Sequence, residues 1–267
     1  MKTKLPIAIL TLLSSFFIQA QQQPKGITGT SNWMTNWSSF NPAKIEYSEA
    51  TNIIAGTIDK DNRITKRNTY QLVGVVYVAN NATLTIEPGT VIRGDDKTCG
   101  TLVITNGAKI MAEGLETDPI VFTSNKEIAE RKPGDWGGII ILGKAPINTI
   151  GGIHILPFDL EPMLNHYGGQ DAEDNSGVLK YVRVEYAGRK LSSLKELNGI
   201  SLAGVGRKTV LSNIQISYSN DDSFECYGGD LNMNNLISYR TTDDDFDFTQ
   251  GAQININNSI AIRHPFS

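Results

Sequence analysis

Acidic side chains recur at matching positions in two neighbouring stretches of the chain. Residues 213–225 are echoed by residues 235–247 at a constant offset of 22 positions. The acidic pairs related by this offset are Asp221 with Asp243, Asp222 with Asp244, and Glu225 with Asp247. Carboxylates gathered in this way serve two kinds of chemistry, which are coordination of a hard cation such as Ca²⁺ and proton transfer to or from a substrate.

The short fixed period predicts how these side chains are brought together. A repeat of this length, with strand-like content and no helical spacing, is typical of a coil of parallel β-strands in which each copy stacks on the last. Equivalent residues of successive laps then lie about 4.8 Å apart. Asparagine and phenylalanine ladders at that spacing are structural, because amides bond to one another and rings stack. Carboxylates at that spacing repel unless water, a proton or a cation lies between them.

Strand alternation assigns each acidic side chain to a face. Phe224, Phe246 and Phe248 share one parity, and we expect them to fill the core. Asp222 and Asp244 have the same parity as the phenylalanines. The other parity gives an outward patch, and the predicted metal ligands on it are Asp221, Glu225, Asp243, Asp245 and Asp247. Such a patch suits Ca²⁺, which takes about six to eight oxygens. The alternative is a solvated acidic face, or aspartates bonded to backbone amides at a corner.

Basic and aromatic side chains on the aligned strands offer a surface for a sugar. The predicted ligand-binding residues are Arg183, Tyr218, Tyr239 and Arg240. A polysaccharide lyase would need a cation beside the acid group of the substrate and a basic group that removes a proton. Alternatively, Arg240 pairs with the nearby acids and the tyrosines complete the wall. No catalytic residue is assigned, because the crowded patch does not distinguish an acid from a base and the chain contains no HExxH or GxSxG motif.

Further echoes extend the coil toward the N-terminus. Residues 83–92 are echoed by residues 101–110 at an offset of 18, and residues 179–186 by residues 211–218 at an offset of 32. The longer offset fits a loop that grows out of one corner, which coils tolerate because each lap contacts only its neighbours. We therefore predict one coil over residues 70–267.

The N-terminal part of the chain divides into a signal and a lead-in. Residues 1–20 carry two lysines and then a short apolar run interrupted by Pro6, which is typical of a secretory signal peptide; the alternative is a membrane anchor. No later segment is apolar enough to cross a bilayer. Residues 21–69 are expected to cap the first lap, with Trp33 and Trp37 covering the core or, alternatively, forming a sugar-stacking surface.

Composition limits the partners and the covalent links. The net charge is −4 and no basic stripe is present, which argues against a nucleic-acid partner. The two cysteines, Cys99 and Cys226, fall several laps apart in the predicted coil. That separation is too great for a disulfide, which needs Cα atoms within roughly 7 Å.

Several motifs together resemble a family of secreted bacterial proteins. The motifs are ATLTIEPGTVI at residues 82–92, GDWGG at 134–138, DNSGVLKYVR at 174–183, NDDSFE at 220–225 and DDDFD at 243–247. In combination they resemble a group of right-handed parallel β-helix proteins that are exported from Gram-negative cells and are often directed to the surface by a C-terminal sorting tail. The group has no established activity, so the resemblance implies no catalytic residues. It leads us to expect more laps or a sorting tail, and the end at Ser267 is interpreted as a truncation or a poorly capped last lap.

The sequence therefore predicts an all-β protein, a right-handed single-stranded parallel β-helix with an N-terminal cap, located in the periplasm, at the cell surface or outside the cell. We expect an exported binding or surface-structural protein that recognises a polysaccharide or another cell-surface component and is stabilised by Ca²⁺. The alternative is a polysaccharide lyase or glycoside hydrolase acting at the acidic face. A groove beside that face with an arginine or lysine across it would favour the enzyme, and a flat wall would favour binding.

Overall fold

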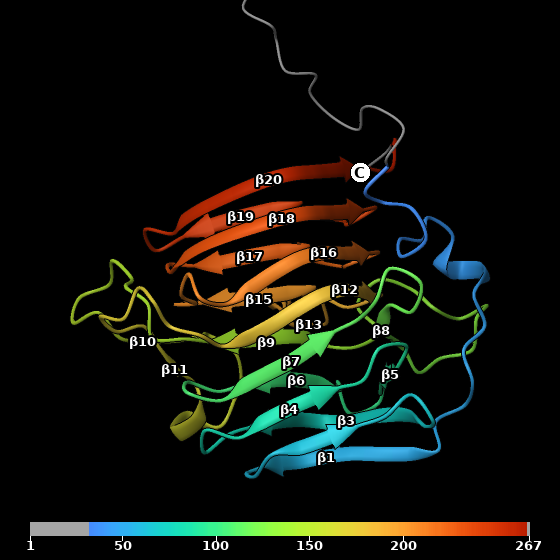
Figure 1. Ribbon diagram of the computed structural model, residues 1–267, viewed down its shortest axis with the longest axis horizontal. Helices are drawn as coiled ribbons and strands as arrows, with labels where there is room; N and C mark the ends of the chain where they lie inside the picture. The colour runs from blue at the N-terminus through green and yellow to red at the C-terminus, as the bar shows by residue number, and fades with distance from the viewer. Residues whose placement is uncertain (1–31, 266–267) are drawn as a thin grey trace, which may run out of the picture.

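The chain folds into a coil of parallel strands that rises lap by lap (Figure 1). The computed structural model describes residues 32–265, so the predicted signal peptide lies outside the described residues. Strands far apart in the sequence lie side by side because each strand pairs with its counterpart one lap later, and the pairs in the 16-stranded sheet are parallel. The predicted all-β parallel β-helix is confirmed.

Three stacks of strands form the wall. Stack A begins with the ends of β1 (Asn52–Ile58) and β3 (Thr69–Val78) and contains β6 (Thr101–Ile104), β9 (Gly138–Leu142), β15 (Ile200–Ala203), β17 (Phe224–Tyr227) and β19 (Phe246–Thr249). Stack B contains the first parts of β1 and β3, then β5 (Val91–Gly94) and β8 (Ile120–Ser124), and then the second halves of β12 (Gly177–Glu185), β16 (Val210–Ser217), β18 (Asp230–Tyr239) and β20 (Gln253–Ile262). Stack C contains β2 (Asn62–Ile64), β4 (Thr83–Ile86), β7 (Lys109–Glu113) and the first halves of β12, β16, β18 and β20.

The long strands turn the corner between stacks C and B at one residue. That residue is Tyr181 in β12, Asn213 in β16, Asn235 in β18 and Asn258 in β20, each with φ between 50° and 58°. Asparagine tolerates this left-handed conformation better than most residues, which explains its recurrence at the corner. The Asn235 amide also donates to Oδ1 of Asn213 at 3.4 Å. The predicted asparagine ladder is confirmed.

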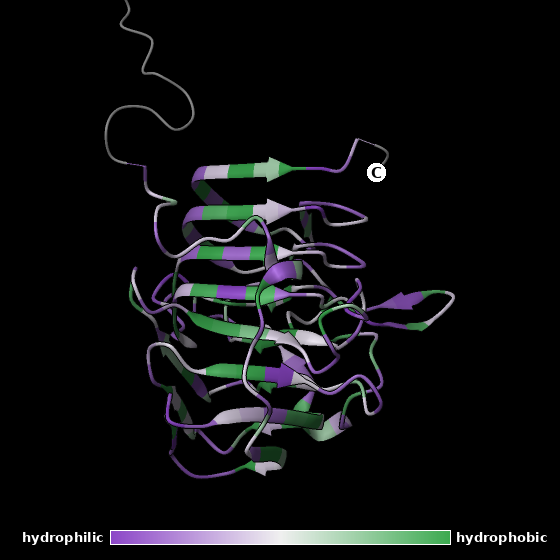
Figure 2. Ribbon diagram, turned by 90° about the vertical axis from the view of Figure 1, so that its right-hand side faces the viewer, coloured by the Kyte–Doolittle hydropathy of each residue, from purple (hydrophilic) through white to green (hydrophobic). Residues whose placement is uncertain are grey.

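The core is an apolar column inside the coil. Isoleucine, leucine and valine side chains from all three stacks fill it, and Figure 2 shows apolar residues at matching positions on successive laps. Phe224 and Phe246 are partners in register, and their rings stack at a centroid distance of 5.4 Å and an interplanar angle of 9°. Phe248 pairs with Cys226 but is 44% exposed, because β19 belongs to the last lap of stack A. The predicted phenylalanine stack therefore holds for Phe224 and Phe246, and Phe248 does not fill the core.

The N-terminal segment departs from the prediction. Residues 32–50, here called the strap, run along the outer face of stack B from its late laps to its early ones and do not cover the first lap (Figure 1). The cause is a set of buried polar side chains on stack B that need partners. Gln215 bonds the backbone N–H and C=O of Ser39 at 2.7 and 2.6 Å, and Arg93 donates to the carbonyl of Ser48 at 3.1 Å. The strap also contains the 3₁₀ turn η1 (Pro42–Lys44).

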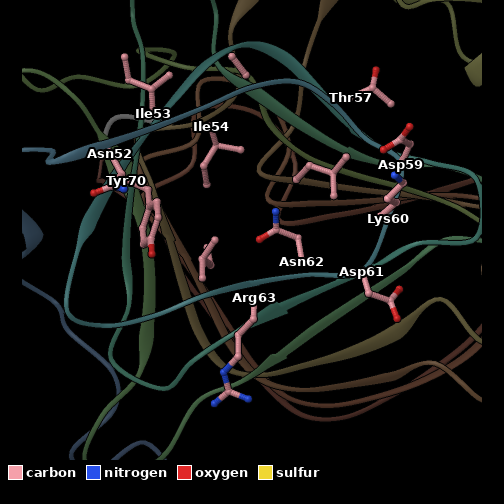
Figure 3. A pocket seen from close by; sticks show the side chains of 13 residues that line it. Asn52, Ile53, Ile54, Thr57, Asp59, Lys60, Asp61, Asn62, Arg63 and Tyr70 are labelled. Carbon is pink, nitrogen blue, oxygen red and sulfur yellow. The ribbon is translucent and has the colours of Figure 1, made fainter.

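The coil begins earlier than expected. β1 (Asn52–Ile58) and β2 (Asn62–Ile64) form its first lap, so the coil starts at Asn52 and not at Tyr70. Within residues 32–265 neither strand has a partner on its outer side, and a hollow of about 510 Å³ opens between them. Figure 3 shows this end, with Asn62 and Ile54 turned into the opening and Arg63 turned away from it.

One long excursion and one short hairpin leave the wall. β10 (His154–Ile155) and β11 (His166–Tyr167) form an antiparallel pair within the long irregular stretch that also holds η2 (Pro162–Leu164). β13 (Lys190–Ser192) and β14 (Lys195–Glu196) form an antiparallel hairpin between β12 and β15. This hairpin is the loop that the offset of 32 predicts. Cys99 and Cys226 are not bonded to each other.

The phenylalanine stack gives a graded stability prediction. Phe224→Ala should lower the free energy of unfolding by about 3–5 kcal/mol, because it removes a fully buried ring. Phe246→Ala should lower the free energy of unfolding by less, about 2 kcal/mol, because Phe246 is only partly buried. Phe248→Ala should lower it by under about 1 kcal/mol, because Phe248 is half-exposed. Urea denaturation of the three variants measures the order. A larger loss for Phe248 than for Phe224 would contradict the face assignment.

An acidic pocket as the candidate functional site

The acidic residues lie on two turns that join stack B to stack A. One turn follows β16 and precedes β17, and the other lies one lap further on, between β18 and β19. Each begins with a left-handed residue, Tyr218 (φ 58°) or Arg240 (φ 56°), which directs the chain around the corner. The turns are bonded to each other, because Oγ1 of Thr241 donates to the carbonyl of Asp221 at 2.6 Å. The lap-to-lap stacking therefore continues through the turns.

These turns line a pocket of about 300 Å³. Six of its side chains are carboxylates from the two turns and from the strands that follow. The lining residues are Asp221, Asp222, Glu225, Asp243, Asp244 and Asp247, together with Tyr227, Pro157, Phe158, Leu194, Lys195 and Glu196. The pocket thus has an acidic floor from the coil and a mixed rim from the hairpin and the 157–158 loop.

Two groups of carboxylates converge in the pocket. Oxygens of Asp221, Asp222 and Asp243 lie within 4.8 Å of one another. The second group is Asp222, Glu225 and Asp247, with the same limit. Asp222 belongs to both groups and is only 7% exposed. Neither group contains histidine or cysteine, so the donor set consists of hard oxygens that suit Ca²⁺ and not a softer transition metal.

The structure rearranges the predicted ligand set. It brings together Asp221, Glu225, Asp243 and Asp247, as the repeat predicts. Asp245 is placed elsewhere: it accepts from Oγ of Ser238 at 2.5 Å and pairs with Arg263 at 3.3 Å. Strand alternation fails here because β19 begins only at Phe246, so the residues before it follow the geometry of a turn.

The prediction from strand alternation was wrong for Asp222. Parity assigned it to the core side with the phenylalanines, but it stands at the centre of the pocket. Its Oδ1 accepts the backbone N–H of Asp244 at 2.9 Å, so it also ties one lap to the next. The doublet of Asp221 and Asp222 at the end of a strand was the available signal, since short polar side chains at a corner commonly bond backbone amides.

Burial and mutual repulsion raise the pKa values in the pocket. Burial raises the pKa of Asp222 to about 8, with a further contribution from the charge of Asp221. Burial likewise raises the pKa of Glu225 to about 7, although Tyr227 and Asn198 both donate to its Oε2 and oppose the shift. For Asp221 burial and the charges of Glu196 and Asp243 raise the pKa to about 6. The pocket therefore retains protons near neutral pH.

A lysine stands on the rim opposite the coil. The hairpin β13–β14 places Lys195 and Glu196 beside the pocket, and Nζ of Lys195 lies 3.1 Å from Oδ1 of Asp159. Glu196 is paired with Lys190. Sequence reasoning located the loop but not these residues, because a hairpin outside the repeat has no counterpart one lap away.

The predicted sugar-binding residues lie apart from the pocket. Arg240 lies over the rings of Tyr239 and Tyr218 at 5.3 and 6.0 Å, so the structure groups these three. The ring of Tyr239 is buried and meets Phe40 of the strap at 5.2 Å. Arg183 is buried beneath the strap, where it donates to Oη of Tyr47 at 3.1 Å. None of the four lines the acidic pocket.

A comparison with protein-family models supports this description. A model described as a pectate-lyase-like β-helix domain matches residues 56–264. The chain belongs to this family. The match to the pectate-lyase-like β-helix family runs from β1 to the end of β20, so it includes both acidic turns and the hairpin. No curated protein and no solved structure is significantly similar to the chain. Among the described residues no helix has the length and apolar character that a membrane span requires.

The raised pKa values predict how stability depends on pH. A folded-state carboxyl whose pKa is raised binds more protons than it does in the unfolded chain, so the stability that it contributes is present at low pH and is lost as pH rises. Without divalent cations the melting temperature should fall between about pH 5 and pH 8, the window set by Asp221, Glu225 and Asp222.

A variant isolates the contribution of the pocket. Asp222→Asn should flatten the pH profile, whereas Asp59→Asn, which removes an exposed carboxylate in the first lap, should leave it unchanged. Thermal denaturation in buffers containing a chelator measures both. A wild-type profile that is flat over this range, or that rises, would contradict the assigned shifts.

Proposed function

We propose that this member of the pectate-lyase-like β-helix family is an exported polysaccharide-binding protein whose acidic pocket holds Ca²⁺ and, with it, an acidic sugar. The observation that carries the proposal is the convergence of carboxylates from two adjacent laps, with Asp222 shared between two groups. Seven carboxylates, Glu196 included, line the pocket with a single lysine, so negative charge is in excess when they are ionised. A divalent cation compensates that charge better than the protons that the raised pKa values imply.

The shape of the pocket fits a cation that is shared with a ligand. The protein supplies its carboxylates from one side, the coil, and Ca²⁺ fills its remaining positions with water or with the oxygens of a ligand. Leu194, which is 93% exposed on the rim, offers apolar surface to a sugar ring, and Lys195 offers a positive charge to the carboxylate of a uronic acid. The sugar class that combines these features is an acidic polysaccharide.

Calcium titration tests the proposal. Ca²⁺ should stabilise the folded protein by about 2.7 kcal/mol when its concentration is 100 times the dissociation constant. The gain should be larger at pH 8 than at pH 5, because binding requires deprotonated carboxylates. Differential scanning calorimetry with Ca²⁺ or EDTA measures it.

The control for this titration lies two residues away. The double variant Asp243→Asn, Asp247→Asn should abolish the shift. Asp245→Asn removes a neighbouring carboxylate that faces away from the pocket, so it should keep the shift. Equal melting temperatures in Ca²⁺ and EDTA would remove the cation from the proposal, and loss of the shift only in Asp245→Asn would place the ion elsewhere.

A second candidate function is polysaccharide elimination, and Lys195 is the observation that favours it. A groove beside the acidic face with a basic residue across it is the arrangement that favours an enzyme, and Lys195 lines the pocket opposite the carboxylates. In such a reaction the amine takes the proton from C5 of a uronate. The C–H electrons form the C4=C5 double bond, and the C4–O bond breaks as the leaving sugar oxygen takes up a proton from water.

Product formation separates the two functions. For a lyase, the protein with Ca²⁺ should generate unsaturated uronate from polygalacturonate, detected by its ultraviolet absorbance, and Lys195→Ala should lower the rate at least about 100-fold. Lys208→Ala, on a different turn, is the matched control. Binding of polygalacturonate without any absorbing product would assign the pocket to recognition alone.

A further inference from the structure

A second groove lies at the corner between stacks C and B. Its floor is the column of left-handed residues Tyr181, Asn213 and Asn235, which follow one another on successive laps. The first turn of the strap forms one side and the 114–119 loop forms the lower end. The groove has a volume of about 460 Å³ and is lined by Asn32, Trp33, Thr35, Glu116, Tyr181, Asn213 and Asn235.

The aromatic side of this groove is held rigidly. Trp33 is half-buried, and its ring stacks on Trp37 at 6.3 Å with an interplanar angle of 27°. Trp37 is completely buried, its indole N–H donates to the carbonyl of Trp33 at 2.7 Å, and Tyr181 meets its ring edge-on at 6.0 Å. Because Trp33 is fixed from behind, it presents an apolar face to the groove without losing further side-chain freedom when a ligand binds.

Amide and hydroxyl groups surround this aromatic face. The side-chain N–H of Asn235 donates to Oδ1 of Asn213, while Oδ1 of Asn235 has no hydrogen-bond partner among the described residues. Leaving a buried acceptor unpaired is costly, and a ligand hydroxyl reached by a small rotation of the amide would satisfy it. Asn32 and Thr35 are exposed on the strap side and add further donors and acceptors.

The groove carries almost no free charge. Glu116 is the single charged residue in its lining, and that carboxylate accepts from Nδ2 of Asn36 at 2.9 Å. Aromatic rings beside neutral amides match a ligand that has both an apolar C–H face and many hydroxyl groups. That description fits a neutral sugar, and it does not fit an anion, which would meet Glu116 without a cation to balance it.

We propose that this groove binds a neutral oligosaccharide, with one pyranose ring stacked on Trp33 and its hydroxyls bonded to Asn213 and Asn235. The site shares no lining residue with the acidic pocket. It goes beyond the proposed function, because it requires neither Ca²⁺ nor an acidic sugar.

Titration with neutral hexasaccharides tests the site. The probes are cellohexaose, xylohexaose, mannohexaose, laminarihexaose, maltohexaose and chitohexaose, each followed by tryptophan fluorescence and by calorimetry in EDTA. At least one should bind in the micromolar to millimolar range. Trp33→Ala should weaken that binding at least about tenfold.

Two further variants keep the result independent of folding. Thr35→Trp adds bulk at an exposed position and removes no packing, so it should block the groove while leaving the melting temperature unchanged. Asn255→Ala, an exposed asparagine on β20 outside the groove, and Asp243→Asn in the acidic pocket should bind the sugar as the wild type does.

Failure of this site is distinguishable from failure of the acidic pocket. Absence of binding by all six sugars, or unchanged affinity in both Trp33→Ala and Thr35→Trp, overturns the groove and leaves the Ca²⁺ result untouched. Loss of sugar binding in Asp243→Asn would instead assign the interaction to the acidic pocket.

Discussion

In-register pairing of parallel strands is the constraint on which the structure depends. Once β16, β18 and β20 pair residue for residue, every side chain has a counterpart about 4.8 Å away on the next lap. The consequence depends on side-chain type. Phe224 and Phe246 gain a stacked ring and Asn213 and Asn235 gain an amide bond, but Asp221 and Asp243 gain only a like charge. The same register therefore stabilises the core and the corner, and it brings like charges together in the acidic turns.

The strap supplies hydrogen-bond partners to the polar side chains on the outer face of stack B. Glu185 is 1% exposed and accepts hydrogen bonds from Oη of Tyr47, and burial raises the pKa of its carboxyl group. Arg93 is equally buried and is paired with Glu49 at 2.9 Å. Burying such side chains under an apolar segment, or covering them without hydrogen-bond partners, would cost free energy. The strap thus belongs to the wall, and it also supplies Trp33 to the groove at the other corner.

The sequence predicted what repeats and missed what does not. The offsets of 22 and 32 predicted the lap-to-lap register, the asparagine ladder and the pairing of Phe224 with Phe246. The offset of 18 was wrong as a register, because residues 83–86 and 101–104 lie in different stacks and Leu84 pairs with Ile110, 26 residues further on. The path of the strap could not be read in the same way, since it depends on which polar side chains of distant laps lack partners. Lys195 was missed for a related reason: its hairpin has no copy from which a position could be inferred. Strand alternation does not hold in the turns. For this reason the prediction from parity wrongly excluded Asp222 from the pocket and wrongly included Asp245.

The division between strands and turns explains where function can be located on this coil. In the strands of stack A, the alternate side chains are committed either to the core or to a second apolar cluster on the outside, so few positions remain free. At the corners the backbone leaves the alternating geometry, and short polar residues can point away from the core without breaking the ladder. The acidic pocket and the groove beside Trp33 both lie at such corners, the first lined by carboxylates and the second by amides. Because each corner repeats lap by lap, amides along one corner bond to one another, whereas carboxylates along another corner repel unless a proton or a cation lies between them.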